Sequence, residues 1–377
     1  MRIGIEAQRI FRPDKHGMDF VILEVLRQLQ YKDKENEYVV FVAPGQDHCI
    51  ESTERMHIVE LKCPSYPLWE QWALPHAVAH AKVDLLHCTS NTAPLHCSVP
   101  LVLTLHDIIY LNSQKSKSMS VYQQLGWHYR RWNVPRIVNH CHRIITVSET
   151  ERINILHRFP DLKDKLSVVH NGYSSYYHPI EESEAYAITR KYLSDKEYLF
   201  FLGNTDPRKN TEGVLLAYNE YLNHSKKALK LVVAGLNKEQ IEKLLASMDI
   251  ERCTSNIIPI GYVPGEDLPA LYNRAFAFLY PSLLEGFGIP VLEAMACGIP
   301  VITSSRSSLP EVAGKGGLLV NPYQPQEIAN AILQLEADKE LYRNQMNYGL
   351  ERAKLFSWEH TAEEYIKIYS CIDKLIT

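Results

Sequence analysis

The stretch Tyr-Pro-Ser-Leu-Leu-Glu-Gly-Phe-Gly-Ile-Pro-Val-Leu-Glu-Ala-Met-Ala-Cys-Gly, residues 280–298, decides how the rest of the chain is interpreted. It follows an apolar run at 275–279, which predicts a buried strand. Pro290 suits the first turn of a helix, and Gly298 suits its end. A second apolar run begins at 301–303. The stretch therefore predicts a strand–loop–helix–strand unit of a parallel α/β sheet.

The loop at 285–289 lies at the carboxyl end of its predicted strand, where open α/β sheets bind ligands. Its glycines allow close approach of the backbone, and the N–H groups at the helix start favour an anion such as a diphosphate. Glu293 lies one turn into the helix, where a carboxylate can accept two hydrogen bonds from a diol such as ribose. A carboxylate on each side of an anion site suits a nucleotide-sugar, although two Glu eight residues apart are also common on solvated helix faces.

The phrases Pro-Ser, Glu-Gly-Phe-Gly-Ile-Pro, Leu-Glu-Ala-Met-Ala and Cys-Gly-Ile-Pro-Val in this order resemble the Glu-x7-Glu signature of the retaining glycosyltransferases of family four, a GT-B group. The resemblance covers nearly the whole chain and is strongest at 203–322. It implies an α/β fold of two Rossmann-like domains facing across a cleft. Their expected bounds are 1–175 for the acceptor-side domain, with about 360–377 crossing back as a C-terminal helix that packs on it, 176–195 for the linker, and 196–359 for the nucleotide-sugar-binding domain.

The resemblance also implies retaining, metal-independent transfer of a sugar from a UDP- or GDP-sugar, GDP-mannose among them, to a hydroxyl of a glycan or lipid-linked acceptor in surface polysaccharide biosynthesis. The nucleotide-sugar is a co-substrate, and no cofactor is expected. The residues that match the family's catalytic positions are His106, Lys209 and Glu285. Those that match its donor-binding positions are Gly17, Asn204, Arg208, Lys209, Tyr262, Val263, Glu285, Gly286, Phe287, Gly288, Ile289 and Glu293.

Each match implies a role. Arg208 and Lys209 meet the diphosphate, with Asn204 where some members carry the Arg, and Tyr262 and Val263 face the nucleobase. Glu285 and His106 bind the donor sugar, Glu293 binds ribose, and Gly17 approaches a phosphate or the acceptor.

Without the resemblance, several of these residues also fit purely structural interpretations. Arg208 and Lys209 are adjacent cations at the start of a predicted helix, where the helix dipole disfavours positive charge. A bound diphosphate would offset this unfavourable interaction, but the two residues also fit ordinary surface charge. A lone His is often structural, and Gly17 also fits a plain turn.

Composition restricts the function further. A chain of 377 residues with 46% hydrophobic and 22% charged residues suits two globular domains, and a net charge of -4 gives no reason to expect nucleic acid as a partner. Eight cysteines without a Cys-x2-Cys pair argue against a zinc site and a disulfide framework, and favour the cytoplasm. Residues 1–6 predict a first strand rather than a signal peptide, and no run approaches the ~20 apolar residues of a spanning helix. We therefore expect a soluble protein, or one at the inner face of a membrane.

The segment 115–152 combines seven Lys or Arg with aromatic residues at helical spacing. Tyr122, Leu125, Tyr129 and Trp132 fit a buried aromatic stripe beside solvated Arg, which we favour. They also fit a basic aromatic surface that meets an anionic membrane or a lipid-phosphate acceptor. Peripheral membrane contact is thus an alternative that the sequence leaves open.

Three other classes of protein remain to be separated. A sugar-nucleotide epimerase shares the architecture but is an isomerase. A two-domain solute-binding protein is a non-catalytic sugar or nucleotide binder, against which the lack of an export signal counts. A dehydrogenase needs a Gly-x-Gly-x-x-Gly after the first strand, and this chain has none there.

Overall fold

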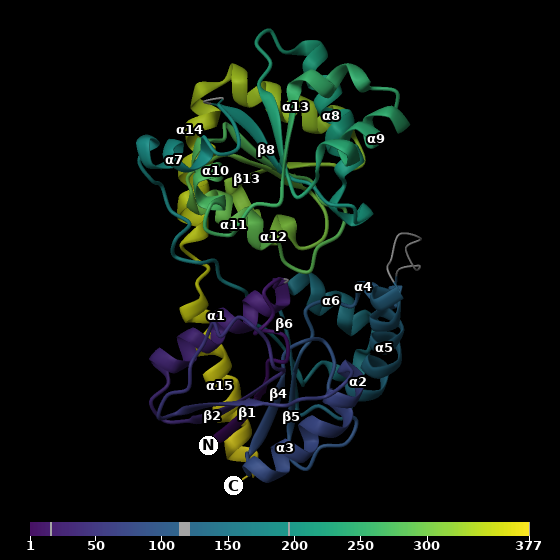
Figure 1. Cartoon of the computed structure of the whole chain (residues 1–377), viewed down its shortest axis with the longest axis vertical. Coiled ribbons are helices and arrows are strands. Elements are labelled where there is room, and N and C mark those ends of the chain that lie inside the picture. Colours follow the sequence, from purple (N-terminus) through teal and green to yellow (C-terminus); the bar gives the residue numbers. More distant parts are fainter. Residues whose placement is uncertain (16, 113–120, 195–196, 377) are drawn as a thin grey trace. The chain divides into compact units, whose positions relative to one another are not determined.

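The computed structural model describes residues 1–15, 17–112, 121–194 and 197–376. The chain forms two compact units (Figure 1). The first comprises Met1–Gly172 with Trp358–Thr377, and the second comprises Tyr173–Ser357. The segment 176–195, where the linker is expected, belongs to the second unit and contains helix α7 (Glu182–Thr189), which packs on α10 (Leu268–Arg274).

The first unit is built on a seven-stranded parallel sheet whose strands are short and mainly apolar, and the five strands between the two edges are almost wholly buried. Helices on both faces exclude water from such strands, which is why they are apolar at successive positions rather than alternating. In spatial order the strands are β3 (Met56–Glu60), β2 (Glu37–Val42), β1 (Arg2–Glu6), β4 (Leu85–Cys88), β5 (Leu101–Thr104), β6 (Arg143–Thr146) and β7 (Leu166–Val168).

From β1 the chain runs outward to β3 and then continues from β4 on the other side of β1, as in Rossmann-like sheets. Helices connect most of the strands. The helices and helical turns of this unit are α1 (Gly17–Lys32), α2 (Tyr66–Leu68), the π-helical turn η1 (Trp69–Ala73), α3 (Leu74–Ala81), α4 (Ile109–Asn112), α5 (Val121–Ile137), α6 (Glu149–Arg158), the 3₁₀ turn η2 (Pro160–Leu162) and α15 (Trp358–Ile376). Ser148 caps α6, because its side chain accepts a hydrogen bond from the backbone N–H of Glu151.

The last helix, α15, packs on α1 within the first unit, which confirms the expected return of the chain. Tyr365, Tyr369 and Ile372 recur at helical spacing on its buried face. The Tyr369 hydroxyl lies 2.6 Å from His87 Nδ1 on β4, and Lys32 at the end of α1 pairs with Glu359. The helix thus covers one face of the sheet (Figure 1).

The second unit is built on a six-stranded parallel sheet. In spatial order its strands are β10 (Ile257–Gly261), β9 (Lys230–Ala234), β8 (Tyr198–Leu202), β11 (Ala277–Tyr280), β12 (Val301–Ser304) and β13 (Gly317–Val320). Besides α7 and α10, its helices and 3₁₀ turns are η3 (Pro207–Lys209), α8 (Thr211–His224), α9 (Lys238–Ser247), η4 (Glu251–Asn256), α11 (Ile289–Ala296), α12 (Leu309–Ala313), η5 (Gly314–Gly316), α13 (Pro325–Ala337) and α14 (Lys339–Ala353). Two parallel α/β sheets confirm the predicted fold class.

Helix α5 corrects the favoured interpretation of the segment 115–152. Leu125 and Trp132 are 65% and 42% exposed, so they form no buried stripe. The face that α5 buries lies on the other side of the helix and carries Val134 and Ile137 instead. The side chain of Tyr122 lies outside the described residues. A helical period locates a stripe but does not say which of two stripes faces the core.

Histidine and cysteine are adjacent at 87–88, 96–97 and 140–142. His87, Cys88 and Cys141 are buried in the first unit, whereas the side chains of His96, His140 and His142 are exposed. Within the described residues no three His, Cys, Asp or Glu side chains gather in a metal-binding group, and the eight cysteines are free thiols. No helix of the described chain is both long and apolar enough to cross a membrane.

Candidate functional site

The winding of the second sheet reverses between β8 and β11, since the chain passes from β8 outward to β9 and β10 and then returns to β11 on the other side. In open parallel sheets the loops that leave such neighbouring strands diverge to opposite faces, and ligands bind at the carboxyl ends there. Lys209 follows β8, and Glu285 follows β11. The topology alone therefore places these two predicted residues at the expected binding edge.

Lys209, Glu285 and Tyr280 form a closely packed polar cluster at this edge. Lys209 Nζ donates hydrogen bonds to Glu285 Oε1 at 2.7 Å and to the Tyr280 hydroxyl at 3.0 Å, and that hydroxyl donates to the same carboxylate at 2.8 Å. The side chains of Lys209 and Glu285 are only 26% and 12% exposed. Burial by itself lowers the pKa of Lys209, but Tyr280 and Glu285 outweigh it, so the pKa rises above its ordinary value. Lys209 is held as a cation.

Local contacts hold the loop after β8 in place and thereby position Lys209. A Cβ on Gly203 would lie 2.7 Å from Val233 Cγ1, so only glycine lets the chain leave the strand here. Asp206 caps η3 by accepting a hydrogen bond from the backbone N–H of Arg208. Asn210, in the left-handed conformation with φ 60°, donates to the carbonyls of Pro281 and Pro322. These bonds tie the Lys209 loop to the loops that follow β11 and β13.

Two of the predicted donor-binding residues, Arg208 and Asn204, form hydrogen bonds within this loop. The Arg208 guanidinium pairs with Asp206 at 2.6 Å. Burial opposes ionisation of Asp206, but the bonds from Arg208 prevail and lower its pKa. Asn204 accepts a hydrogen bond from the backbone N–H of Asp206 at 2.8 Å and bonds to Thr211 through its own backbone. Both residues lie beside Lys209 in sequence and space, at the entrance to α8.

The loop after β11 delivers the amino end of α11 to the same edge. Gly288 precedes that helix with φ 118°, and a Cβ there would lie 2.6 Å from Leu309 Cδ2. Ser307 and Ser308, which follow β12, bind the loop from the other side: Ser307 Oγ lies 2.6 Å from the Glu285 carbonyl, and Ser308 Oγ donates to the Phe287 carbonyl at 2.7 Å. The backbone from Gly286 to Ile289 is thereby held at the start of a helix, where an anion is favoured.

Glu293 lies within α11, partly buried against two tyrosines. The Tyr272 hydroxyl donates to Glu293 Oε2 at 3.3 Å, and Tyr177 also hydrogen-bonds to this carboxyl. Burial raises the pKa of Glu293 to about 7. The carboxyl is thus a weaker acid than usual and is already engaged on one side.

Tyr262 and Val263 follow β10 at the same edge of the sheet, two strands from β8, or about 10 Å away. Tyr262 is 81% exposed, whereas Val263 is buried. The preceding Gly261 has φ 66°, which turns the chain out of the strand.

The remaining predicted residues lie in the first unit. His106 follows β5 and is buried, with Nε2 2.9 Å from the Thr89 carbonyl and its backbone N–H bonded to Asn91 Oδ1. Burial lowers the pKa of His106, and because a carbonyl can only accept, Nε2 carries the proton and Nδ1 is left as an acceptor. Gly17 is the first residue of α1, and a Cβ there would meet nothing within 4 Å. Its position therefore does not require glycine for steric reasons.

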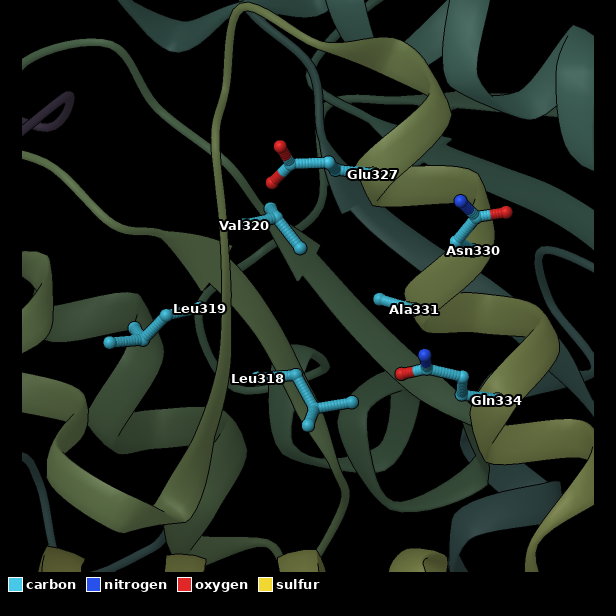
Figure 2. A pocket seen from close by; sticks show the side chains of 7 residues that line it. All are labelled: Leu318, Leu319, Val320, Glu327, Asn330, Ala331 and Gln334. Carbon is cyan, nitrogen blue, oxygen red and sulfur yellow. The ribbon is translucent and has the colours of Figure 1, made fainter.

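The structure adds residues that sequence reasoning missed. Tyr280 stands in the stretch quoted first, but nothing in the sequence says that its hydroxyl bonds to both Lys209 and Glu285. Ser307 and Ser308 follow β12, the next strand at the same edge, and that placement was the available signal. A separate hollow of about 270 Å³ lies between β13 and α13, where Leu318, Glu327 and Gln334 are among its lining residues (Figure 2). It lies at the outer strand of the sheet and contains none of the predicted residues.

The chain resembles known glycosyltransferases in both sequence and fold. The family model "Glycosyl transferases group 1" matches residues 187–352, and "Glycosyltransferase Family 4" matches residues 16–175. Together the two matches span most of the chain. The fold is that of the GT-B class of glycosyltransferases.

The chain belongs to the group 1 glycosyltransferases, family four. It is 36% identical over 230 residues to the O-antigen chain mannosyltransferase B of Escherichia coli, a match that covers 61% of this chain and 60% of that protein. Among solved structures it resembles sucrose-phosphate synthase from Thermosynechococcus elongatus, with a TM-score of 0.76, 20% identity and coverage of 99% of both chains. It also resembles Anabaena HepE in complex with UDP-glucose, with a TM-score of 0.73, 16% identity and coverage of 98% of this chain and 100% of that one.

Proposed function

We propose that this protein transfers a sugar from a nucleoside-diphosphate sugar to a hydroxyl of a glycan or lipid-linked acceptor, with retention of configuration at the sugar carbon and without a metal ion. The observation that carries the proposal is the Lys209–Glu285 pair at the switch point, next to the start of α11. A fixed cation, helix amides and a carboxylate within one loop cluster match the charges of a diphosphate joined to a hydroxyl-rich sugar.

Each group has a role in this reaction. Lys209 and the amides from Gly286 to Ile289 stabilise the negative charge that develops on the departing diphosphate, and Arg208 joins them by turning from Asp206. Glu285 accepts hydrogen bonds from the hydroxyls of the donor sugar. Because these groups are already held in place by the protein, little reorganisation is needed as the charge forms.

The nucleoside is bound by the flanking residues. Glu293 accepts hydrogen bonds from the ribose diol, and the backbone at Tyr262 and Val263 meets the base. The exposed ring of Tyr262 at the β10 end supports this assignment, since it lies at the same edge as Lys209. In the first unit, His106 contacts a sugar hydroxyl and Gly17 approaches the donor phosphate or the acceptor.

Retention follows if the acceptor attacks from the face that the diphosphate leaves. The bond from the sugar carbon to the phosphate oxygen breaks, the bond to the acceptor oxygen forms, and the acceptor proton passes to the departing phosphate. No carboxylate in this scheme acts as a nucleophile, and the positive charge comes from Lys209, Arg208 and the amides rather than from a metal ion.

Mannose is the sugar we propose, and surface polysaccharide is the product, because the E. coli relative is an O-antigen chain mannosyltransferase. The base is either guanine or uracil; the similarity to HepE bound to UDP-glucose keeps uracil in consideration. A lipid-linked acceptor lies in a membrane, and we propose that the protein acts on it from the cytoplasm, at the inner surface of that membrane.

A ligand panel tests the proposal. The melting temperature of the protein is measured with GDP-mannose, UDP-glucose, ADP-glucose and NAD, and with the same ligands for Lys209→Ala. We expect one nucleotide-sugar to raise the melting temperature of the wild type and to lose most of that effect in the variant. Stabilisation by NAD alone would contradict the proposal. A donor that is converted to its epimer without acceptor would show an epimerase, and binding without any turnover would show a non-catalytic binder.

A further inference from the structure

Two neighbouring elements of the first unit expose aromatic side chains to solvent. On the α2–η1 segment, Leu68 and Trp72 are exposed one turn apart, and Trp72 is 62% exposed. On α5, Leu125 and Trp132 are exposed two turns apart, on the side opposite to the buried Val134. These four apolar side chains face water within one unit, where burial elsewhere would stabilise them.

The two elements lie side by side. Gln71 Nε2 donates a hydrogen bond to the Tyr129 hydroxyl at 2.7 Å, and the rings of Tyr66 and Tyr129 meet edge to face with centroids 5.8 Å apart. Tyr129 in turn lies against Trp132, at 5.8 Å between centroids. The contacts of Tyr129 with Gln71 and Tyr66 thus form a seam between η1 and α5, and the exposed side chains of the two elements flank this seam. Helices α2 and α5 are neighbours in Figure 1.

The exposed Arg, Lys, Asp and Glu side chains of these two elements are all cationic. The segments 66–81 and 121–137 contain three arginines and a single acidic residue, Glu70. Glu70 is fully buried and bonded to Tyr66, Thr92 and Tyr129, so it presents no charge to solvent. Arg131 and Arg136 are exposed, and each stacks on a tryptophan, Arg131 over Trp127 and Arg136 over Trp132. A chain of net charge -4 thus carries a local cationic area.

We propose that Leu68, Trp72, Leu125, Arg131, Trp132 and Arg136 form a surface that docks on an anionic lipid bilayer. Tryptophan sits well at the boundary between headgroups and acyl chains, and arginine pairs with lipid phosphates. The absence of exposed acidic side chains from the two segments matches a negative surface. The choice of a bilayer over another protein rests on the proposed lipid-linked acceptor, which would lie in such a membrane. The surface itself is independent of the donor site.

Vesicle flotation tests this surface. The wild-type protein is mixed with vesicles of phosphatidylcholine alone or with 30% phosphatidylglycerol, and the bound fraction is measured at low and high salt. We expect binding to the anionic vesicles that weakens as salt rises. Arg131→Glu with Arg136→Glu should reduce the partition coefficient roughly fivefold or more per cation, and Trp72→Ser on the order of tenfold. Lys227→Glu and Tyr348→Ser, which change an exposed cation and an exposed aromatic of the second unit, should bind as the wild type does.

Three further readouts keep the outcomes distinct. Circular dichroism melting shows whether each variant is folded, and the Trp72→Ser variant changes a side chain that is already largely in water. Equal binding of wild type and variants, or equal binding to both vesicles, would overturn the proposal. So would a dimer in sedimentation velocity that the variants dissociate without any vesicle binding, which would make the surface an interface between copies. The melting-temperature shift with nucleotide-sugars should stay unchanged in these variants; its absence from the wild type would overturn the proposed function and leave the lipid surface standing.

Discussion

Replacing Lys209 by alanine is the most direct test of the donor site. The substitution removes the ammonium that bonds to Glu285 and to Tyr280, and leaves the Glu285 carboxylate bonded to Tyr280 and without its cation. Because both side chains of the pair are mostly buried, water compensates only in part. We expect the free energy of unfolding to fall by about 1–3 kcal/mol, which a domain of this size tolerates.

The effect on catalysis should be larger. One preorganised charge contact to a developing anion contributes about 3–4 kcal/mol to the transition state, so turnover should fall roughly 100- to 1,000-fold. Binding of the nucleoside diphosphate should weaken roughly 10- to 100-fold, as expected for a lost charge-assisted hydrogen bond. Binding of the nucleoside alone should hardly change, since Lys209 is assigned to the diphosphate.

The assay measures nucleoside diphosphate released from the donor, with calorimetric titration of the diphosphate and of the nucleoside. Lys191→Ala is the matched control, because Lys191 also pairs with a carboxylate of the second unit, Asp267, at 3.1 Å. It should keep full turnover. Wild-type turnover in Lys209→Ala, or an equal loss of affinity for diphosphate and nucleoside, would refute the assignment.

Three other substitutions give distinct results. Glu285→Gln should lower turnover by more than tenfold yet tighten nucleoside diphosphate binding, because Lys209 loses its competing carboxylate; weaker diphosphate binding in titration would contradict this. Gly288→Ala should lower the melting temperature and abolish diphosphate binding, since its φ of 118° and the approach to Leu309 both oppose a Cβ, at a cost of about 1–3 kcal/mol. Glu293→Gln should remove a pH dependence of stability. With the folded pKa raised from 4.5 to about 7, the wild type loses stability as pH rises between these values, by about 3 kcal/mol at most, so the melting temperature of the variant relative to wild type should increase from pH 5 to pH 8.

Much of the fold could be predicted because buried parallel strands have a simple sequence pattern. The runs that end at Leu105, Thr146 and Tyr280 are short and mainly apolar, and the loops that follow them carry polar residues or glycine. The same pattern placed the loops that contain Lys209 and Glu285, because residues just after a buried strand lie at the carboxyl edge of the sheet, and the resemblance to family four singled out the two residues within these loops.

The rest depended on geometry that a linear pattern does not encode. Helix α5 has two faces with aromatic or branched residues, and only the packing beneath it selects Val134 and Ile137 for the core. The partnership of Arg208 with Asp206 follows from the tight turn of η3, which brings side chains two residues apart together. The bonding of Tyr280, the last residue of β11, to both Lys209 and Glu285 requires the loops that follow β8 and β11 to meet at the end of that strand.

The return of the chain in α15 has a consequence for how the molecule is made. During synthesis the first 172 residues emerge well before the helix that contacts β4 through Tyr369 and α1 through Glu359. At a translation rate of about 5–20 residues per second, the nascent sheet of the first unit remains without α15 for on the order of ten seconds or longer. During this time Tyr173–Ser357 can fold on the ribosome. Stop codons a few turns before the C-terminus should therefore yield an aggregation-prone product even though every residue of the donor site is present.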